Sequence, residues 1–172
     1  VVGFGLIGAL TARLLMDIPA VEVLFLEPHP YRRRLAEEWG LAPWPEATPP
    51  PADIAFHASA TGAGLQAAVQ AVGREGRIVE MSWYGDRSVE LRLGLDFHQG
   101  RKRILSSQVS HLPAARQARW DYRRRKEAVL RLLQAAHWDT LLDRRIPFAE
   151  APTLFEQIRL GQVGELACLL IY

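Results

Sequence analysis

The sequence predicts an α/β fold: a doubly wound parallel sheet followed by a C-terminal tail of helices and one strand. Three observations lead to this prediction. Apolar segments of strand length alternate with helical segments over roughly the first 100 residues, which is typical of a parallel sheet whose connections are helices. The glycine pattern Gly3-Phe4-Gly5-Leu6-Ile7-Gly8 joins the first strand to the first helix. After residue 109 the alternation stops, and an arginine-rich helical segment leads to a short helix and an apolar end.

Six strands are expected in the first part of the chain. The second contains the near-continuous apolar run Val21–Leu26, as expected of a parallel strand that is covered on both faces. The third lies in a stretch that Pro43, Pro45 and the run 49–51 make an extended surface loop. A further short, exposed strand is predicted at 89–93, where apolar and polar residues alternate. The six expected strands span residues 1–4, 21–27, 41–44, 53–58, 76–82 and 103–109.

The helices are predicted from the spacing of their apolar residues. The helix at 6–16 begins within the glycine pattern and places Ile7, Leu10, Leu14 and Leu15 on one face. Shorter helices are expected at 31–39, where Gly40 ends the helix, and at 65–72 and 151–160.

A long helix is predicted for 113–136, with arginines around an apolar stripe, and the chain closes on an apolar strand at 166–172. The stripe consists of Ala115, Ala118, Tyr122, Val129, Leu133 and Ala136. The chain is therefore expected to comprise a dinucleotide-binding domain at 1–109 and a C-terminal segment at 110–172 that packs on it.

The composition is that of an ordinary globular chain, with 49% hydrophobic and 23% charged residues. A net charge of +2 does not argue for a nucleic-acid partner. The single cysteine, Cys168, excludes an internal disulfide and a cysteine-rich zinc site. No apolar run has the length of a membrane span, so we expect a cytoplasmic protein without a membrane partner. The preference for arginine over lysine indicates a bacterial source.

The three glycines of the pattern have separate roles in a dinucleotide site. Gly3 permits a tight turn out of the strand, Gly5 lets a pyrophosphate approach the backbone, and Gly8 lets the helix pack closely on the sheet. The helix then directs N–H groups of its first turn, which includes Leu6 and Ile7, at the phosphates. The alternative is a structural turn without a ligand.

An acidic residue at the end of the second strand indicates which cofactor binds. Glu27 lies nineteen residues after Gly8, where a carboxylate accepts the ribose hydroxyls of NAD and repels a 2′-phosphate. Against this, the run Arg32–Arg34 begins the next helix and could hold the 2′-phosphate of NADP. If these arginines are instead a solvated helix face, NAD is the expected cofactor, with NADP as the alternative.

Residues after three other strands are expected to line the cofactor crevice, because ligands bind at the carboxyl ends of parallel strands. These residues are Ser59, Ser82 and Gln108; in the alternative they are ordinary loop residues. His57 is expected to be a satisfied core or crevice residue. The five histidines are scattered without the spacing of a metal site, so no metal-binding residue is expected in this chain.

The order of motifs resembles the medium-chain dehydrogenase/reductase family, the zinc-type alcohol dehydrogenases and their relatives. The resemblance rests on three stretches, of which the first is the glycine pattern together with Glu27. The second is the stretch 53–64 followed by Gly76-Arg77-Ile78-Val79. The third is the tail from Ile146 to Phe155 with Gly161 and Gly164. The bulky stretch 80–84, Ser106-Ser107 and Glu165 depart from the family pattern and leave subfamily and substrate open.

The resemblance implies an NAD(P)-dependent oxidoreductase that transfers a hydride between nicotinamide and a small alcohol or carbonyl substrate. In the family a GroES-like catalytic domain precedes the nucleotide-binding part and supplies any zinc ligands, so we expect this chain to be a fragment that is inactive alone. No catalytic residue is carried over onto this sequence. The full-length enzyme is expected to be a homo-oligomer.

Two other classes of function are kept open. One is a non-catalytic nucleotide-binding or interaction module whose apolar final strand pairs with a partner. The other is nucleic-acid binding by the arginines at 116–126, although Asp121 and Glu127 interrupt the charge and favour a solvated helix face.

Overall fold

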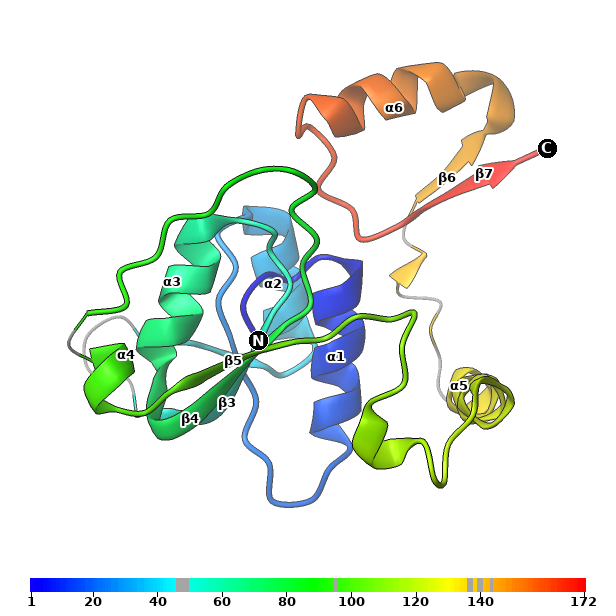
Figure 1. Ribbon diagram of the computed structural model, residues 1–172. Coiled ribbons are helices and arrows are strands. Elements are labelled where there is room, and N and C mark those ends of the chain that lie inside the picture. The colour runs from blue at the N-terminus through cyan, green and yellow to red at the C-terminus, as the bar shows by residue number, and fades with distance from the viewer. Residues whose placement is uncertain (46–49, 95, 136–137, 139–140, 143) are drawn as a thin grey trace. The chain divides into compact units, whose positions relative to one another are not determined.

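The computed structural model describes residues 1–45, 50–94, 96–135, 138, 141–142 and 144–172. These residues form two compact units, Val1–Ser107 and Gln108–Tyr172 (Figure 1). Part of the predicted proline loop, residues 46–49, lies outside the described residues, as do Ala136 and His137.

The first unit is built on a parallel sheet with the N-terminal residues at its centre. The N–H of Val2 donates to the carbonyl of Phe56 at 2.8 Å on one side, and the N–H of Gly3 donates to the carbonyl of Leu26 at 2.9 Å on the other. The other strands are β1 (Leu24–Phe25), β2 (Ala42–Pro43), β3 (Ala52–His57), β4 (Val72–Glu80) and β5 (Arg103–Ser106). With residues 1–3 between β1 and β3, the strand order is β2-β1-(1–3)-β3-β4-β5, and every pairing is parallel. This is the doubly wound order of dinucleotide-binding folds, and the predicted fold class is confirmed.

Four helices connect these strands: α1 (Leu6–Met16), α2 (Pro30–Glu38), α3 (Gly62–Ala71) and α4 (Asp96–Gln99). The helix predicted to start at residue 65 begins at Gly62, because the Thr61 hydroxyl caps it by accepting the N–H of Gly64 at 3.0 Å. It passes directly into β4, which therefore starts four residues earlier than predicted.

The buried face of α1 differs from the prediction. Its buried residues are Gly8, Ala9 and Ala12, whereas Ile7 and Leu14 are exposed. The small residues let the helix backbone approach the sheet closely, and this close approach decides which face is buried.

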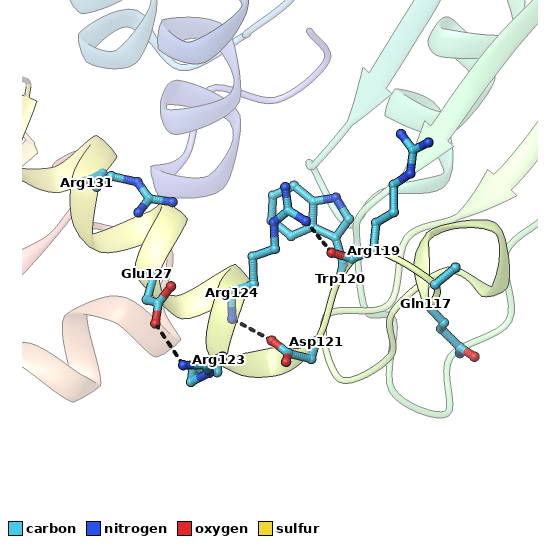
Figure 2. A pocket seen from close by; sticks show the side chains of 9 residues that line it. Gln117, Arg119, Trp120, Asp121, Arg123, Arg124, Glu127 and Arg131 are labelled. Atoms are coloured by element: carbon cyan, nitrogen blue, oxygen red, sulfur yellow. Dashed lines mark hydrogen bonds and ion pairs between the residues drawn. The ribbon is translucent and has the colours of Figure 1, made fainter.

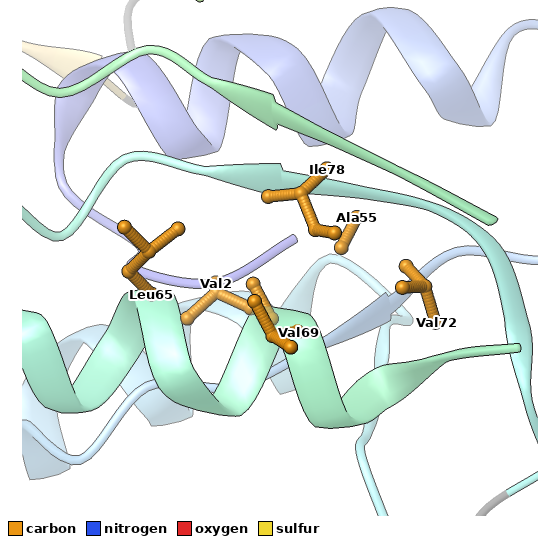
Figure 3. Close-up of a cluster of buried hydrophobic side chains, with 7 residues drawn as sticks. Val2, Ala55, Leu65, Val69, Val72 and Ile78 are labelled. Carbon is orange, nitrogen blue, oxygen red and sulfur yellow. The ribbon is translucent and has the colours of Figure 1, made fainter. Parts of the chain in front are cut away.

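The main hydrophobic core lies between α3 and the sheet (Figure 3). It consists of Val2, Ala55, Leu65, Ala68, Val69, Val72 and Ile78. The segment 89–93, predicted as a short strand, is not a strand; Val89 and Leu91 instead pack against this core. The N–H of Arg92 donates to Gln66 Oε1 at 2.7 Å, which fixes the segment on α3 without a partner strand.

The described residues of the second unit form two helices and a pair of parallel strands. The helix predicted at 113–136 is interrupted: a 3-10 turn at Ala114–Arg116 precedes α5 (Tyr122–Ala135). Asp121 accounts for the late start, because its Oδ1 accepts the N–H of Arg124 at 2.7 Å in the manner of a helix cap. The predicted apolar stripe is exposed at Tyr122, Val129 and Leu133. The remaining elements are β6 (Arg144–Pro147), a 3-10 turn (Phe148–Glu150), α6 (Ala151–Arg159) and β7 (Cys168–Ile171), with β6 and β7 paired in parallel.

Candidate functional site

The glycine turn has the geometry that a phosphate-binding turn requires. Gly3 has a φ of +89°, and a Cβ there would lie 2.8 Å from Ser59 Cα. A Cβ on Gly8 would lie 1.9 Å from the carbonyl oxygen of Gly3, so the helix packs on the turn only with glycine at this position. Among the described residues, a Cβ on Gly5 would meet only the Arg32 guanidinium, at 3.8 Å. Gly5 therefore leaves open space beside the backbone, where the expected pyrophosphate would lie.

The N-terminus of α1 follows this turn. Its cap residue is Gly5, and in the described part of the chain no side chain caps the helix. The first helical residues, Leu6 and Ile7, are exposed. The N–H groups of a first helical turn have no partner within the helix and carry partial positive charge, so this end can receive an anion.

Glu27 is held beside the turn by two backbone groups. Its side chain is 8% exposed, its Oε2 accepts the N–H of Phe4 at 2.6 Å, and its Oε1 accepts the N–H of His29 at 2.8 Å. Phe4 is in turn fixed by ring contacts with Phe25 and Trp39, at centroid distances of 5.9 and 5.5 Å. The carboxylate therefore occupies a set position at the end of β1, and each of its oxygens has capacity for a further donor.

The hollow beside Glu27 has a volume of about 520 Å³ and is lined by Pro28, Arg33 and Trp44, among others. Of the three arginines, Arg32 is half-buried and lies nearest Gly5, whereas Arg33 pairs with Glu37 at 3.2 Å and Arg34 is exposed. Arg32, the arginine of this run predicted to bind the cofactor, is therefore the one that lies beside the turn.

His29 was not singled out from the sequence. Its Nδ1 is buried and, among the described residues, lacks a hydrogen-bond partner. An orphaned buried nitrogen adjacent to Glu27 is suited to a polar ligand atom. Its place between Pro28 and Pro30, two residues after Glu27, was the available signal.

A buried polar network joins the ends of β3 and β4. His57 is fully buried; its Nδ1 lies 2.8 Å from Glu80 Oε2, and its Nε2 lies 2.7 Å from Ser59 Oγ. Tyr84 donates its hydroxyl to Glu80 Oε2 at 3.0 Å, and the Ser82 N–H donates to Glu80 Oε1 at 2.7 Å. His57 is thus the satisfied core residue that the sequence predicted, whereas the roles of Glu80 and Tyr84 were missed.

The partners of Glu80 determine the direction of these hydrogen bonds. An ionised carboxylate only accepts, so the Nδ1 of His57 carries the hydrogen that Glu80 receives. The Nε2 is then an acceptor and takes the hydroxyl hydrogen of Ser59. Burial and the neighbouring Glu80 carboxylate raise the pKa of Tyr84 to about 12, so the phenol remains a donor at neutral pH.

Most of the predicted site residues belong to the first unit and lie at the carboxyl ends of its strands. Gly3, Glu27, Ser59 and Ser82 follow adjacent strands of the sheet, and the Ser82 hydroxyl accepts the N–H of Ala60 at 3.0 Å. Gln108 begins the second unit, where its Oε1 accepts the N–H of Ser110 at 2.5 Å.

A separate hollow of about 420 Å³ lies in the second unit, along α5 and the turn before it (Figure 2). Its arginines are partly compensated: Arg123 lies 3.9 Å from Glu127, and the Arg124 guanidinium stacks over Trp120 at 4.7 Å. The described residues contain no cluster of three potential metal ligands. They also contain no helix long and apolar enough to cross a membrane.

Comparison with known proteins identifies the fold. No family model matches the chain, and no curated protein matches it in sequence. Solved structures match 99% of the chain. One, described as a zinc-binding dehydrogenase of Sinorhizobium meliloti and bound to NADP, has a TM-score of 0.73 at 21% identity, with 51% of its length covered.

Two further structures agree with it. The 2R,3R-butanediol dehydrogenase of Bacillus subtilis has a TM-score of 0.71 at 20% identity, with 49% of its length covered. An Escherichia coli protein described as a short chain alcohol dehydrogenase, in complex with NADH, has a TM-score of 0.72 at 20% identity, with 51% covered. The chain therefore has the fold found in about half the length of these dehydrogenases, and the resemblance predicted from the sequence is confirmed at the level of the fold.

Proposed function

We propose that this chain is the cofactor-binding part of an NAD(H)-dependent oxidoreductase. The observation that carries the proposal is the position of Glu27, fixed by Phe4 N–H beside a turn whose Gly5 leaves open space. A carboxylate at this point receives the hydroxyls of the adenosine ribose, while the turn and the first residues of α1 receive the pyrophosphate.

The proposed site includes the residues predicted from the sequence that belong to the first unit. Gly3, Gly5, Leu6, Ile7 and Gly8 form the phosphate turn, Glu27 and Arg32 flank the adenosine half, and Ser59 and Ser82 line the nicotinamide half. Gln108, the first residue of the second unit, stays a prediction from the sequence. The bound dinucleotide would supply hydride chemistry with a small alcohol or carbonyl. The residues of this chain bind and orient it, and catalytic groups, with zinc if any is used, belong to a GroES-like domain outside this sequence.

Fluorescence titration with NADH and NADPH tests this proposal. The chain is expected to bind NADH more tightly than NADPH, and Glu27→Ala should weaken NADH binding by about tenfold, the equivalent of one or two lost hydrogen bonds. Glu38→Ala, at an exposed position on α2, is the matched control and should leave both affinities unchanged. Failure to bind either nucleotide would refute the proposal, and tighter binding of NADPH would refute the preference for NAD.

The second unit favours a second candidate, an interaction module. It exposes apolar side chains on α5, including Val129, Leu130, Leu132 and Leu133, and the aromatic pair Phe148 and Tyr172, stacked at 4.6 Å. Such a surface is suited to another protein domain or chain. Sedimentation at increasing concentration tests whether the chain associates; a monomer at all concentrations would exclude a second copy as the partner.

A further inference from the structure

The three side chains Ser59, His57 and Glu80 form a hydroxyl–imidazole–carboxylate series that the proposed cofactor chemistry does not use. Ser59 Oγ lies 2.7 Å from His57 Nε2, and His57 Nδ1 lies 2.8 Å from Glu80 Oε2. This is the constellation in which a base activates a hydroxyl and a third group orients the base. We propose that Ser59 is a nucleophile that attacks small carboxylic esters, with His57 as its general base and Glu80 as the residue that positions His57.

The hydrogen-bond directions agree with this assignment. Glu80 accepts hydrogen bonds from the Tyr84 hydroxyl, the Ser82 N–H and His57 Nδ1, and these three donors keep its carboxylate and the imidazole in place. His57 is fully buried and has no freedom to turn, and its Nε2 is left as an acceptor for the Ser59 proton. The base is therefore in the tautomer that the chemistry needs.

Ser59 itself is accessible and close to a source of positive potential. It is half-buried, at the carboxyl end of the sheet, and the following residue, Ala60, has a φ of +52°, a left-handed conformation at the end of a strand. Its Oγ lies against the first turn of α3, since a Cβ on Gly64 would be only 2.1 Å away. The Gly64 N–H of that turn already donates to the Thr61 hydroxyl, so the N–H groups of Gly62 and Ala63 are the donors we assign to the developing oxyanion.

The reaction balances without a further reagent. Ser59 Oγ bonds to the ester carbonyl carbon while its proton passes to His57 Nε2, and the C–O bond to the alcohol then breaks as the alcohol takes that proton. Water attacks the acyl-serine in the same way, giving a proton to Nε2 that Ser59 Oγ regains on leaving. The products are one carboxylic acid and one alcohol for each ester and water consumed.

A fluorophosphonate probe tests the nucleophile on the intact chain, because phosphonylation of Ser59 Oγ with release of fluoride uses the same proton transfer to His57. We expect one label per chain, located on Ser59 by peptide mass spectrometry, together with slow hydrolysis of p-nitrophenyl acetate. Ser59→Ala should abolish both. Ser110→Ala, which removes an exposed serine of the second unit, should change neither.

Variants of the other two residues test the mechanism. His57→Gln should lower the labelling rate by about 10²-fold or more, the usual contribution of a general base. Glu80→Gln keeps the size of the side chain, but its amide can donate to His57 Nδ1 and hold the other tautomer, so labelling should fall while the thermal unfolding temperature stays within a few degrees of the parent. If His57→Gln does not fold, Glu80→Gln and the labelling of the parent chain decide the question.

The proposal is overturned if Ser59 in the folded parent chain takes no label, if Ser59→Ala hydrolyses the ester at the parental rate, or if folded Glu80→Gln is labelled at the parental rate. These outcomes are separate from nucleotide binding. If the chain binds NADH but Ser59 is not labelled, only the esterase proposal is refuted. If Ser59 is labelled but the chain does not bind NADH, only the proposed cofactor function is refuted.

Discussion

Gly8 packs against the carbonyl oxygen of Gly3 more closely than any side chain would allow. At this scale the requirement for glycine is steric, because the residue lies in α1 and a Cβ would overlap the backbone of the turn. The same contact fixes the first turn of α1 next to the open space beside Gly5, so folding and the proposed nucleotide binding depend on one pair of residues.

Replacement of Gly8 is therefore expected to damage both properties. Gly8→Ala should lower the free energy of unfolding by about 3 kcal/mol, as expected of overpacking against a rigid backbone, and should weaken NADH binding. Urea unfolding and the fluorescence titration are the measurements. Gly94→Ala is the control: a Cβ there meets no described atom within 4 Å, so its effect should stay within about 0.5 kcal/mol. Equal stability of the two variants would contradict the prediction.

Tyr84 provides a second residue-scale prediction. Its pKa is raised to about 12 by burial and by Glu80, so the folded chain binds a proton there that the unfolded chain releases near pH 10. Stability should therefore fall as the pH rises from about 10 to 12, and the last phenol to ionise, followed by absorbance at 295 nm, should disappear in Tyr84→Phe. In Glu80→Gln this phenol should ionise at lower pH; an unchanged titration would contradict the role of the carboxylate.

At the scale of elements, the spacing of apolar residues predicted most helices and strands, but 89–93 is not a strand and the predicted buried face of α1 is wrong. The helix at 6–16 was predicted with its correct bounds, yet its small residues rather than its leucines face the sheet. The long helix predicted at 113–136 is interrupted before α5 because Asp121 caps a new start. Both differences arise from specific contacts, which the spacing of apolar residues along the chain does not specify.

Lys102 joins two elements and allows a matched test. Its side chain is buried, and its ammonium donates to the carbonyl of Val69 at the end of α3, at 2.9 Å, and to Asp96 of α4. Lys102→Met keeps the apolar stem but leaves the Val69 carbonyl without this donor, so the free energy of unfolding should fall by about 1–3 kcal/mol.

The other lysine of the chain supplies the control for this change. Lys126 is exposed on α5, so Lys126→Met should alter stability by no more than about 0.5 kcal/mol. Thermal and urea unfolding compare the two variants. A larger loss from Lys126→Met than from Lys102→Met would show that the link between α3 and α4 contributes little.

At the scale of the whole molecule, the two units differ in how many of their side chains are buried. The main core cluster lies entirely within Val1–Ser107, whereas the described residues of α5 include no buried side chain. A chain truncated after Ser107 should therefore unfold cooperatively, as followed by circular dichroism. In the full chain, hydrogen exchange should be slower for the amides of α3 than for those of α5. Non-cooperative unfolding of the truncated chain would contradict this division.

The sequence by itself determined the alternation of strands and helices, the glycine turn and the place of Glu27 at the end of the second strand. These are local properties, since residue spacing and the absence of a Cβ act over a few neighbours. Only the tertiary structure brought Glu80 to His57 and His57 to Ser59, and it buried His29 Nδ1 without a hydrogen-bond partner among the described residues. The physical reason is that such contacts depend on the parallel register of β3 with β4 and on how closely helices approach the sheet, which no short stretch of sequence specifies.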